Sequence, residues 1–403
     1  NKYEVIGCLY NNDYRNLETE VEEGARIELI DISSKEGMKI YVRTIVYIMG
    51  KAFENLYNRE KIMVEYQLGN AMYCKCDNIQ ITDEFITKLK NEMQKIIEKD
   101  EKITKVEMTR KEAEKFYEEN NSSRGRLQFD LKGNKTIYMY YCGNYYNYCY
   151  GTLANRTGII KIFDVIKYGD GFLIRYPSSK EPTKMPEFHE TKKLAWALEE
   201  FEKIHSVLDV LTVYKLNKAI EEDRIKDVIM LAEALHEKKI SQMADKIAER
   251  KGVKMVLIAG PSSSGKTTFA QRLGIQLKIN GLRPVTISVD NYFVERKDTP
   301  LNEKGEYDFE SINAIDIDLF NKHLLALLNG EEVEMPEFDF QEGTKKYNGN
   351  KIKLGKDDVL VIEGIHCLND KLTERIPQDQ KYKIYISALT VLNMDAINRI
   401  STT

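Results

Sequence analysis

The pattern of apolar and polar positions divides the chain into segments with different periodicities. Near the start, residues 3–6 and 25–30 alternate apolar with polar side chains, which predicts two short strands. Asn11-Asn12-Asp13 and Gly24 supply the turns between them. A segment of about 33 residues cannot enclose a hydrophobic core alone, so we interpret it as the end of a small β-rich module.

Two helices are predicted next. Within residues 38–57, apolar side chains recur at intervals of three and four, at Ile45, Ile48, Met49, Ala52, Phe53 and Leu56. Thr82 is placed to cap a second helix, and Asp83 and Glu84 follow it at the positive end of the helix dipole. The apolar stripe of this second helix consists of Phe85, Leu89, Met93, Ile96 and Ile97.

The middle of the chain changes from strands to helices. Residues 136–176 are rich in Tyr, Ile and Phe with glycines at intervals, which predicts a sheet. The tyrosines from Tyr138 to Tyr150 either fill the core of this sheet or form an aromatic binding surface, and their alternation favours the core. Residues 190–250 contain neither Gly nor Pro and predict a helical connector.

Uninterrupted apolar strands begin near residue 254. They are predicted at residues 255–259, 284–289, 359–362 and 382–386, with helical segments between them. Apolar strands that alternate with helices are typical of a parallel sheet covered on both faces.

Composition narrows the classes of function. Lys and Arg total 60 against 64 Asp and Glu, a net charge of −4 that disfavours nucleic-acid binding through bulk charge but leaves room for a local basic groove. No run of 18 apolar residues predicts a membrane span. The N-terminus does not resemble a signal peptide and lacks Met, so we expect a cytoplasmic protein and a sequence that is a piece of a longer chain.

Cysteine and histidine usage restricts metal and disulfide chemistry. The six cysteines are too few and too scattered for a disulfide framework, so we expect reduced and mostly buried thiols. Cys74 and Cys76 are separated by one residue, which is too close for a zinc knuckle. None of the five histidines precedes His189.

The strongest chemical signal is a phosphate-loop pattern, G-x-x-x-x-G-K-[ST], between a predicted strand and a predicted helix that stops at Asn280-Gly281. Such a loop turns backbone N–H groups toward phosphate oxygens at a helix N-terminus. Lys266 is expected to reach the β- and γ-phosphates of ATP, and the Thr267 hydroxyl to ligate Mg²⁺. The candidate phosphate-binding residues are Gly260, Pro261, Ser262, Ser263, Ser264, Gly265, Lys266, Thr267 and Thr268.

Two carboxylates are expected beside this loop. Asp290 directly follows the second parallel strand, and Glu363 ends the third. The carboxyl ends of parallel strands share one edge of the sheet, where ligands bind. With Thr267, these carboxylates form a candidate Mg²⁺ site, because hard oxygen ligands suit that ion.

Four motifs in order make residues 253–403 resemble the uridine kinase and phosphoribulokinase family of P-loop kinases. They are Asp290-Asn291-Tyr292-Phe293, Tyr307-Asp308-Phe309-Glu310, Pro336-Glu337-Phe338-Asp339-Phe340 and Glu363-Gly364-Ile365. The resemblance implies that Asp290 is the general base for the substrate 5′-hydroxyl and that Asp308 holds the ribose hydroxyls. It also implies that Tyr292, Phe338 and Phe340 contact the nucleoside, and that Glu363 brings a Mg²⁺ carboxylate.

Two departures from the family pattern affect these expectations. Uridine and cytidine kinases carry a His that reads the pyrimidine edge, whereas residues 341–347 contain none. A purine nucleoside is therefore an open alternative. The family also continues into an arginine-rich lid helix past the position of Thr403, so we expect part of the active site to lie outside this sequence.

The N-terminal half resembles two modules of threonyl-tRNA synthetases. Residues 1–33 resemble the end of a ubiquitin-like TGS module, and residues 36–180 resemble the second domain, which removes mischarged amino acids. The synthetase domain has a His-x-x-x-His helix and a later Cys-x-x-x-His. Here these positions are Arg43 and Tyr47, then Cys149 and Leu153, so we expect a retained fold without zinc or editing chemistry.

The sequence thus predicts an α/β P-loop kinase domain with a parallel sheet, preceded by an α+β editing-like domain and a TGS remnant. The expected boundaries are 1–34, 35–189, 190–252 and 253–403. The expected activity is ATP- and Mg²⁺-dependent phosphorylation of a nucleoside, as in a bacterial group of long nucleoside kinases. The alternatives are a kinase for another sugar substrate, or an RNA-binding regulatory protein that senses ATP. The sequence leaves open whether the protein forms a homo-oligomer.

Overall fold

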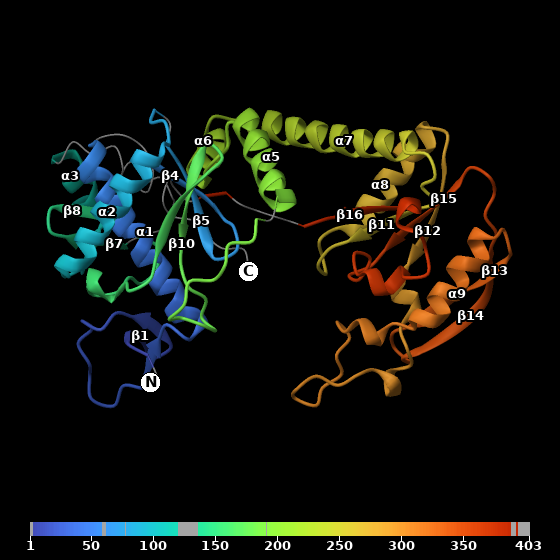
Figure 1. Cartoon of the computed structure of the whole chain (residues 1–403), viewed down its shortest axis with the longest axis horizontal. Helices are drawn as coiled ribbons and strands as arrows, with labels where there is room; N and C mark the ends of the chain where they lie inside the picture. The colour runs from blue at the N-terminus through green and yellow to red at the C-terminus, as the bar shows by residue number, and fades with distance from the viewer. Residues whose placement is uncertain are drawn as a thin grey trace. The chain divides into compact units, whose positions relative to one another are not determined.

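We analysed a computed structural model of the chain, which describes residues 3–58, 62–76, 78–119, 136–190, 192–387 and 392–393. The chain divides into two compact units, Asn1–Met230 with Thr390–Thr403, and Leu231–Leu389. Figure 1 labels most of the helices and strands of both units, and each unit is described by itself.

Unit 1 begins with a small antiparallel sheet in the order β2-β1-β3. Its strands are β1 (Val5–Tyr10), β2 (Asp13–Arg15) and β3 (Ile27–Asp31). The predicted turn at Asn11 and Asn12 is confirmed, with left-handed φ angles of 46° and 66°. Ile6 is fully buried in the same core as the first long helix, so this sheet depends on its neighbour for a core.

Two helices form the centre of unit 1. They are α1 (Lys35–Tyr57), capped by Ser34, and α2 (Asp83–Lys99), capped by Thr82. The Thr82 side chain accepts a hydrogen bond of 3.2 Å from Phe85 N, which confirms the predicted cap. The buried residues of α2 are the predicted stripe, Phe85, Leu89, Met93, Ile96 and Ile97.

Two antiparallel sheets complete the α+β part of unit 1. The first has the order β4-β5-β10-β9 and the second β6-β7-β8, with α3 (Arg110–Glu119) after β6. The strands are β4 (Ile62–Gln67), β5 (Ala71–Cys76), β6 (Thr104–Thr109), β7 (Thr136–Cys142), β8 (Tyr145–Tyr148), β9 (Asp164–Tyr168) and β10 (Gly171–Arg175). No tyrosine of β7 or β8 is exposed, which confirms the interpretation of the tyrosine-rich stretch as core.

The predicted helical segment between residues 190 and 250 is confirmed as three helices. They are α5 (Lys192–Leu208), α6 (Val213–Glu221) and α7 (Ile225–Glu249). All of α7 from Leu231 onward belongs to unit 2, where Ile240, Ala244 and Ile247 share a buried core with residues of α8 (Lys266–Ile279).

Unit 2 is built on a four-stranded sheet in the order β12-β15-β11-β16, with every pair parallel. The strands are β11 (Met255–Ala259), β12 (Arg283–Ser288), β15 (Asp358–Glu363) and β16 (Lys381–Tyr385). Alternate residues of one strand enter different cores: Leu257 lies in one, and Val256 and Ile258 in the other. The predicted parallel sheet covered on both faces is confirmed.

Helices and a hairpin surround this sheet. Phe269 and Leu273 of α8 (Lys266–Ile279) enter one core, and Phe320 and Leu324 of α9 (Ile317–Leu328) enter the other. An antiparallel hairpin joins β13 (Val333–Asp339) to β14 (Thr344–Ile352). No helix in the described part of the chain is long and apolar enough to cross a membrane.

Candidate functional site

The phosphate-loop pattern lies between β11 and α8, as predicted. Ser263 and Gly265 have positive φ angles of 60° and 83°, so the backbone reverses direction twice within the loop. A Cβ on Gly260 would lie 2.2 Å from the Ile386 carbonyl oxygen, which makes glycine necessary there. Because α8 begins at Lys266 behind a glycine cap, no side chain of the cap residue occupies the first backbone N–H groups, and these are available to phosphate oxygens.

Polar atoms inside this loop fit a phosphate ligand. The Lys266 ammonium donates a 3.1 Å hydrogen bond to the Pro261 carbonyl, which holds it over the loop. The Ser264 hydroxyl oxygen is buried without a hydrogen-bond partner among the described residues. A buried polar atom without a partner costs stability, and a phosphate oxygen would satisfy it.

Two of the predicted Mg²⁺ ligands meet at the carboxyl edge of the sheet. Thr267 Oγ1 lies 3.4 Å from Glu363 Oε1, and Glu363 is only 7% exposed. Glu363 pairs in register with Ser288 of β12, two residues before Asp290. A Cβ on Gly364 would lie 2.7 Å from Val289 Cβ, so glycine allows the ends of β12 and β15 to approach. The hydroxyl and carboxylate oxygens gathered here suit Mg²⁺.

Asp290 is half-buried just beyond β12, in the 3₁₀ turn Val289–Tyr292. Burial raises the pKa of its carboxyl group above the usual value, although the nearby charges of Lys266 and His366 oppose the shift. Sequence reasoning did not identify His366, three residues after Glu363. Its Nε2 atom is buried without a hydrogen-bond partner among the described residues.

The predicted aromatic pair is part of a larger cluster. The ring centroids of Phe338 and Phe340 are 5.1 Å apart, and Phe293 lies 5.6 Å from Phe338 and 6.1 Å from Phe340. Phe309 contacts Phe293, and Tyr307 contacts Phe309. Phe338 is 8% exposed and Phe340 58%, so the cluster has a buried base and an open edge.

Two other predicted substrate residues have different surroundings. The Tyr292 ring is 1% exposed, packs edge-on against Phe320, and places its hydroxyl 3.1 Å from His323 Nδ1. Tyr292 is therefore a core residue that supports the turn carrying Asp290. Asp308 is half-buried, and its carboxylate accepts a 3.1 Å hydrogen bond from Glu310 N in a loop turn.

A polar cavity of about 300 Å³ lies between β12 and the β13–β14 hairpin. Asn291, next to Asp290, lines it together with Glu337 and Asn348. Asn348 donates a 2.8 Å hydrogen bond to Glu337, and the Asn291 side chain accepts one of 3.4 Å from Phe338 N. The cavity wall is thus connected to both the aromatic cluster and the Asp290 turn.

In unit 1, the residues at the synthetase-like positions lie close together. Tyr47, 3% exposed, donates a 2.9 Å hydrogen bond to the Tyr140 carbonyl. Tyr47 and Leu153 share a buried cluster, and Cys149 packs against it. The Arg43 guanidinium fills the space beside Gly151, where a Cβ would lie 2.8 Å from Cζ. A packed tyrosine core therefore occupies the positions of the synthetase ligands.

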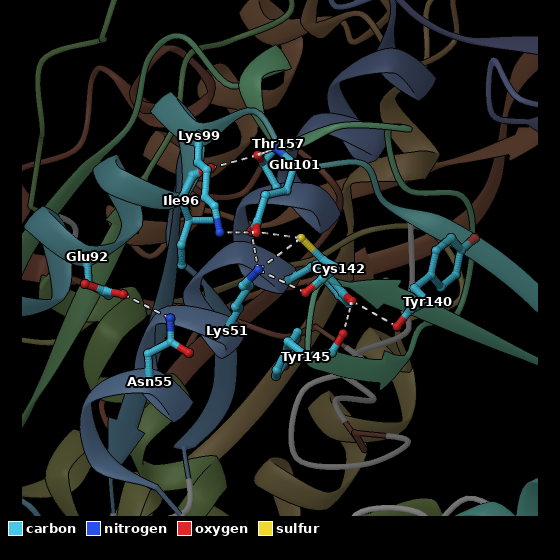
Figure 2. Close-up of polar contacts among 11 residues, drawn as sticks. Lys51, Asn55, Glu92, Ile96, Lys99, Glu101, Tyr140, Cys142, Tyr145 and Thr157 are labelled. Atoms are coloured by element: carbon cyan, nitrogen blue, oxygen red, sulfur yellow. Dashed lines mark hydrogen bonds and ion pairs between the residues drawn. The ribbon is translucent and has the colours of Figure 1, made fainter.

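A buried ion pair adjoins this core (Figure 2). Lys51, one helical turn after Tyr47 and 7% exposed, pairs with Glu101 and donates a 2.9 Å hydrogen bond to the Cys142 carbonyl. Lys99 also donates to Glu101, at 2.8 Å. Burial alone would raise the pKa of Glu101, but the hydrogen bonds from the two lysines lower it to about 2.

Glu101→Gln should destabilise unit 1 by about 3–5 kcal/mol, because it leaves the buried Lys51 ammonium without a counter-charge. The only Trp of the chain, Trp196, belongs to this unit, so its fluorescence during urea unfolding gives the free energy of unfolding.

The stabilisation by Glu101 should depend on pH. The pKa of Glu101 in the folded state lies below the usual 4.5, so the stabilisation is complete above pH 4.5 and decreases as the pH falls toward 2. The matched control Glu84→Gln removes an exposed pair with Lys88 and should change the stability far less. Equal costs for both variants would contradict the prediction.

We expect the purified protein to hold no stoichiometric zinc, because of the residues at the four synthetase-like positions. A guanidinium, a phenol and an alkyl group replace three of the four ligands, and one cysteine does not make a zinc site. Elemental analysis after equilibration with zinc and dialysis against zinc-free buffer measures this. One zinc per chain that survives dialysis would contradict the prediction.

A parallel sheet with a phosphate loop at its carboxyl edge gives unit 2 the architecture of a P-loop nucleotide-binding domain. Residues 255–401 match the Phosphoribulokinase / Uridine kinase family. This part of the chain is therefore similar to that family. A uridine kinase of Mycoplasma genitalium is 35% identical over 138 residues, which are 34% of this chain and 62% of that protein.

The N-terminal region is similar to threonine–tRNA ligases. The ligase of Caldanaerobacter subterraneus is 26% identical over 171 residues, 42% of this chain and 27% of the ligase. Among solved structures, a possible uridine kinase from Bacillus stearothermophilus is 23% identical with a TM-score of 0.31, covering 37% of this chain and 79% of that one. The chain spans 48–62% of the length of three uridine kinases that it matches, and about a quarter of the ligases.

Proposed function

We propose that the chain belongs to an ATP- and Mg²⁺-dependent kinase that phosphorylates the 5′-hydroxyl of a nucleoside. The observation that carries the proposal is the arrangement at one sheet edge: the phosphate loop, Thr267 3.4 Å from Glu363, and Asp290 within the field of Lys266. A hydrolase or a switch would need the loop and a metal carboxylate only. The second carboxylate beside the loop supports an acceptor hydroxyl that must lose a proton.

The chain's own groups would perform the transfer as follows. The loop amides and the Lys266 ammonium bind the phosphate oxygens and stabilise the charge on the γ-phosphoryl group during in-line transfer. Mg²⁺, when bound, neutralises phosphate charge, and Thr267, Glu363 and Asp290 are its candidate ligands.

Asp290 would accept the proton of the 5′-hydroxyl. Burial raises the pKa of the Asp290 carboxyl group, which makes it a stronger base than an exposed carboxylate. The nearby charges of Lys266 and His366 oppose this shift, because they favour the ionised form that accepts a proton.

The aromatic cluster supports a flat base as part of the substrate. Phe340 offers an open ring edge-on to the buried ring of Phe338, and stacking on such rings is sequence-tolerant for nucleobases. Asp308, half-buried in its loop, would accept hydrogen bonds from the ribose hydroxyls. The absence of His from residues 341–347 leaves purine and pyrimidine nucleosides both as candidates.

The test is a screen of the full-length natural protein with ATP against four ribonucleosides, four deoxynucleosides and a sugar phosphate. Formation of a nucleoside monophosphate from at least one nucleoside is expected. If only the sugar phosphate is phosphorylated, the acceptor is a sugar and the proposed nucleoside substrate is wrong. ATP binding without any transfer, together with a salt-dependent shift of tRNA, would favour the regulatory RNA-binding alternative.

A further inference from the structure

A second cavity, of about 420 Å³, lies in unit 1 on the sheet β4-β5-β10-β9. Tyr66 and Tyr73, which pair in register on β4 and β5, line it together with Tyr168 of β9. Cys74 follows Tyr73 in the sequence, and Phe172 of β10 pairs with Cys74 in register. Both side chains lie on the opposite face of the sheet, in the core that contains α1 and α2. The cavity therefore occupies the face of this sheet that α1 and α2 leave uncovered.

The aromatic wall of this cavity is fixed by packing. Tyr66 and Tyr73 stack with centroids 4.7 Å apart and an interplanar angle of 27°, and Tyr168 meets Tyr73 edge-on at 6.0 Å. A Cβ on Gly171 would lie 2.8 Å from the Tyr73 ring, so the bare glycine lets the ring lie flat on β10. Tyr66 and Tyr73 are 6% and 5% exposed, so the wall is preorganised instead of forming on binding.

Helix α5 supplies the other side of the cavity. Ala195 and Trp196 line it. Trp196, the only Trp of the chain, is 60% exposed. Beneath them, Lys75 is held by two hydrogen bonds to Glu202, of 2.8 and 3.0 Å, and lies 5.7 Å from the Tyr73 ring centroid. An exposed indole and an ordered tyrosine wall in the lining of one cavity offer aromatic surface to a flat ligand.

The charges of the cavity identify the kind of ligand. Three lysines line it, and three carboxylates balance them: Lys75, Lys167 and Lys192, with Asp170, Glu190 and Glu199. Because these positive and negative side chains are equal in number, they provide hydrogen-bond donors and acceptors but no net positive potential that would attract a phosphate group. An uncharged ring system with a polar edge fits this lining better than a nucleotide does.

We propose that this cavity binds a free nucleoside through its base, at a site separate from the phosphate loop. The cavity shares no residue with the candidate kinase site, whose residues lie in unit 2. The proposal stands on the lining of unit 1 and does not require that the kinase proposal be correct.

Trp196 fluorescence provides a local test, because no other indole contributes to the signal. The full chain is titrated with uridine, cytidine, adenosine and guanosine, and with their 5′-monophosphates, exciting at the red edge of indole absorption. A saturable change with at least one nucleoside is expected, with weaker binding of the matching monophosphate. No saturable change with any nucleoside, or tighter binding of monophosphates, overturns the proposal.

Three variants locate the binding site. Tyr168→Ala, on a half-buried ring, should weaken binding about tenfold, the loss of one base–aromatic stack. Asp308→Asn, which should weaken nucleoside binding at the kinase site, should leave the Trp196 titration unchanged and so separates the two sites. Tyr14→Leu, at an exposed tyrosine outside the cavity, is the matched control and should bind as the parent does. Parental affinity in Tyr168→Ala, or loss of the signal in Asp308→Asn, places the nucleoside elsewhere and contradicts the proposal.

Discussion

Lys266→Ala should reduce nucleoside phosphorylation by about 10²–10³ in turnover, comparable to the loss of one preorganised donor at a developing charge. The ammonium is tethered to the Pro261 carbonyl at the mouth of the phosphate loop, so alanine removes both the charge and its fixed position. Turnover with saturating ATP and nucleoside measures the effect directly.

Lys278→Ala is the matched control for this change. Lys278 is an exposed lysine in the last turn of the same helix, remote from the loop in sequence. It should retain parental turnover. Near-normal turnover in a folded Lys266→Ala protein would contradict the kinase proposal itself.

Asp290→Asn should lower kcat by about 10²–10⁴, the usual contribution of a positioned proton acceptor, with little change in the KM for the nucleoside. The amide keeps the shape of the side chain but cannot take the proton of the 5′-hydroxyl. Asp308→Asn should instead raise the nucleoside KM and weaken the preference for ribo- over deoxynucleosides, because ribose binding is shared by ground and transition states.

Both substitutions are designed to preserve the backbone. An asparagine at 308 still offers an oxygen to Glu310 N, so the turn can keep its 3.1 Å hydrogen bond. Asp298→Asn, at an exposed acid of the same loop region, should leave both constants unchanged. A pure KM defect in Asp290→Asn with a kcat defect in Asp308→Asn would reverse the two roles.

The elements with clear periodicity could be predicted from sequence. The stripe of α2 and its Thr82 cap were predictable because each residue acts within its own helix. The parallel strands were predictable because both faces are buried and their residues are uniformly apolar. From the strand ends, the proximity of Thr267 and Glu363 follows by topology alone.

Features that depend on distant partners could not be predicted in this way. Strand β14 is almost wholly exposed and rich in Lys and Asn, so it lacks the alternation that marks a strand. The pairing of Lys51 with Glu101 joins residues 50 positions apart, and charge alone does not identify such a partner. Tyr292 and Phe293 are neighbours in sequence and both are buried, but Tyr292 packs against Phe320 whereas Phe293 packs against Phe338. Their sequence does not show which partner each ring meets.

The tyrosine core at the synthetase-like positions opposes the introduction of metal-binding histidines. Tyr47→His would remove the phenol that now bonds the Tyr140 carbonyl, and would leave that carbonyl without its partner inside a closed core. Leu153→His would place a polar ring among tyrosines at a position with no exposed surface. Each of these single substitutions carries a cost in stability before any set of metal ligands is complete, so a metal site could be built here only through destabilised intermediates.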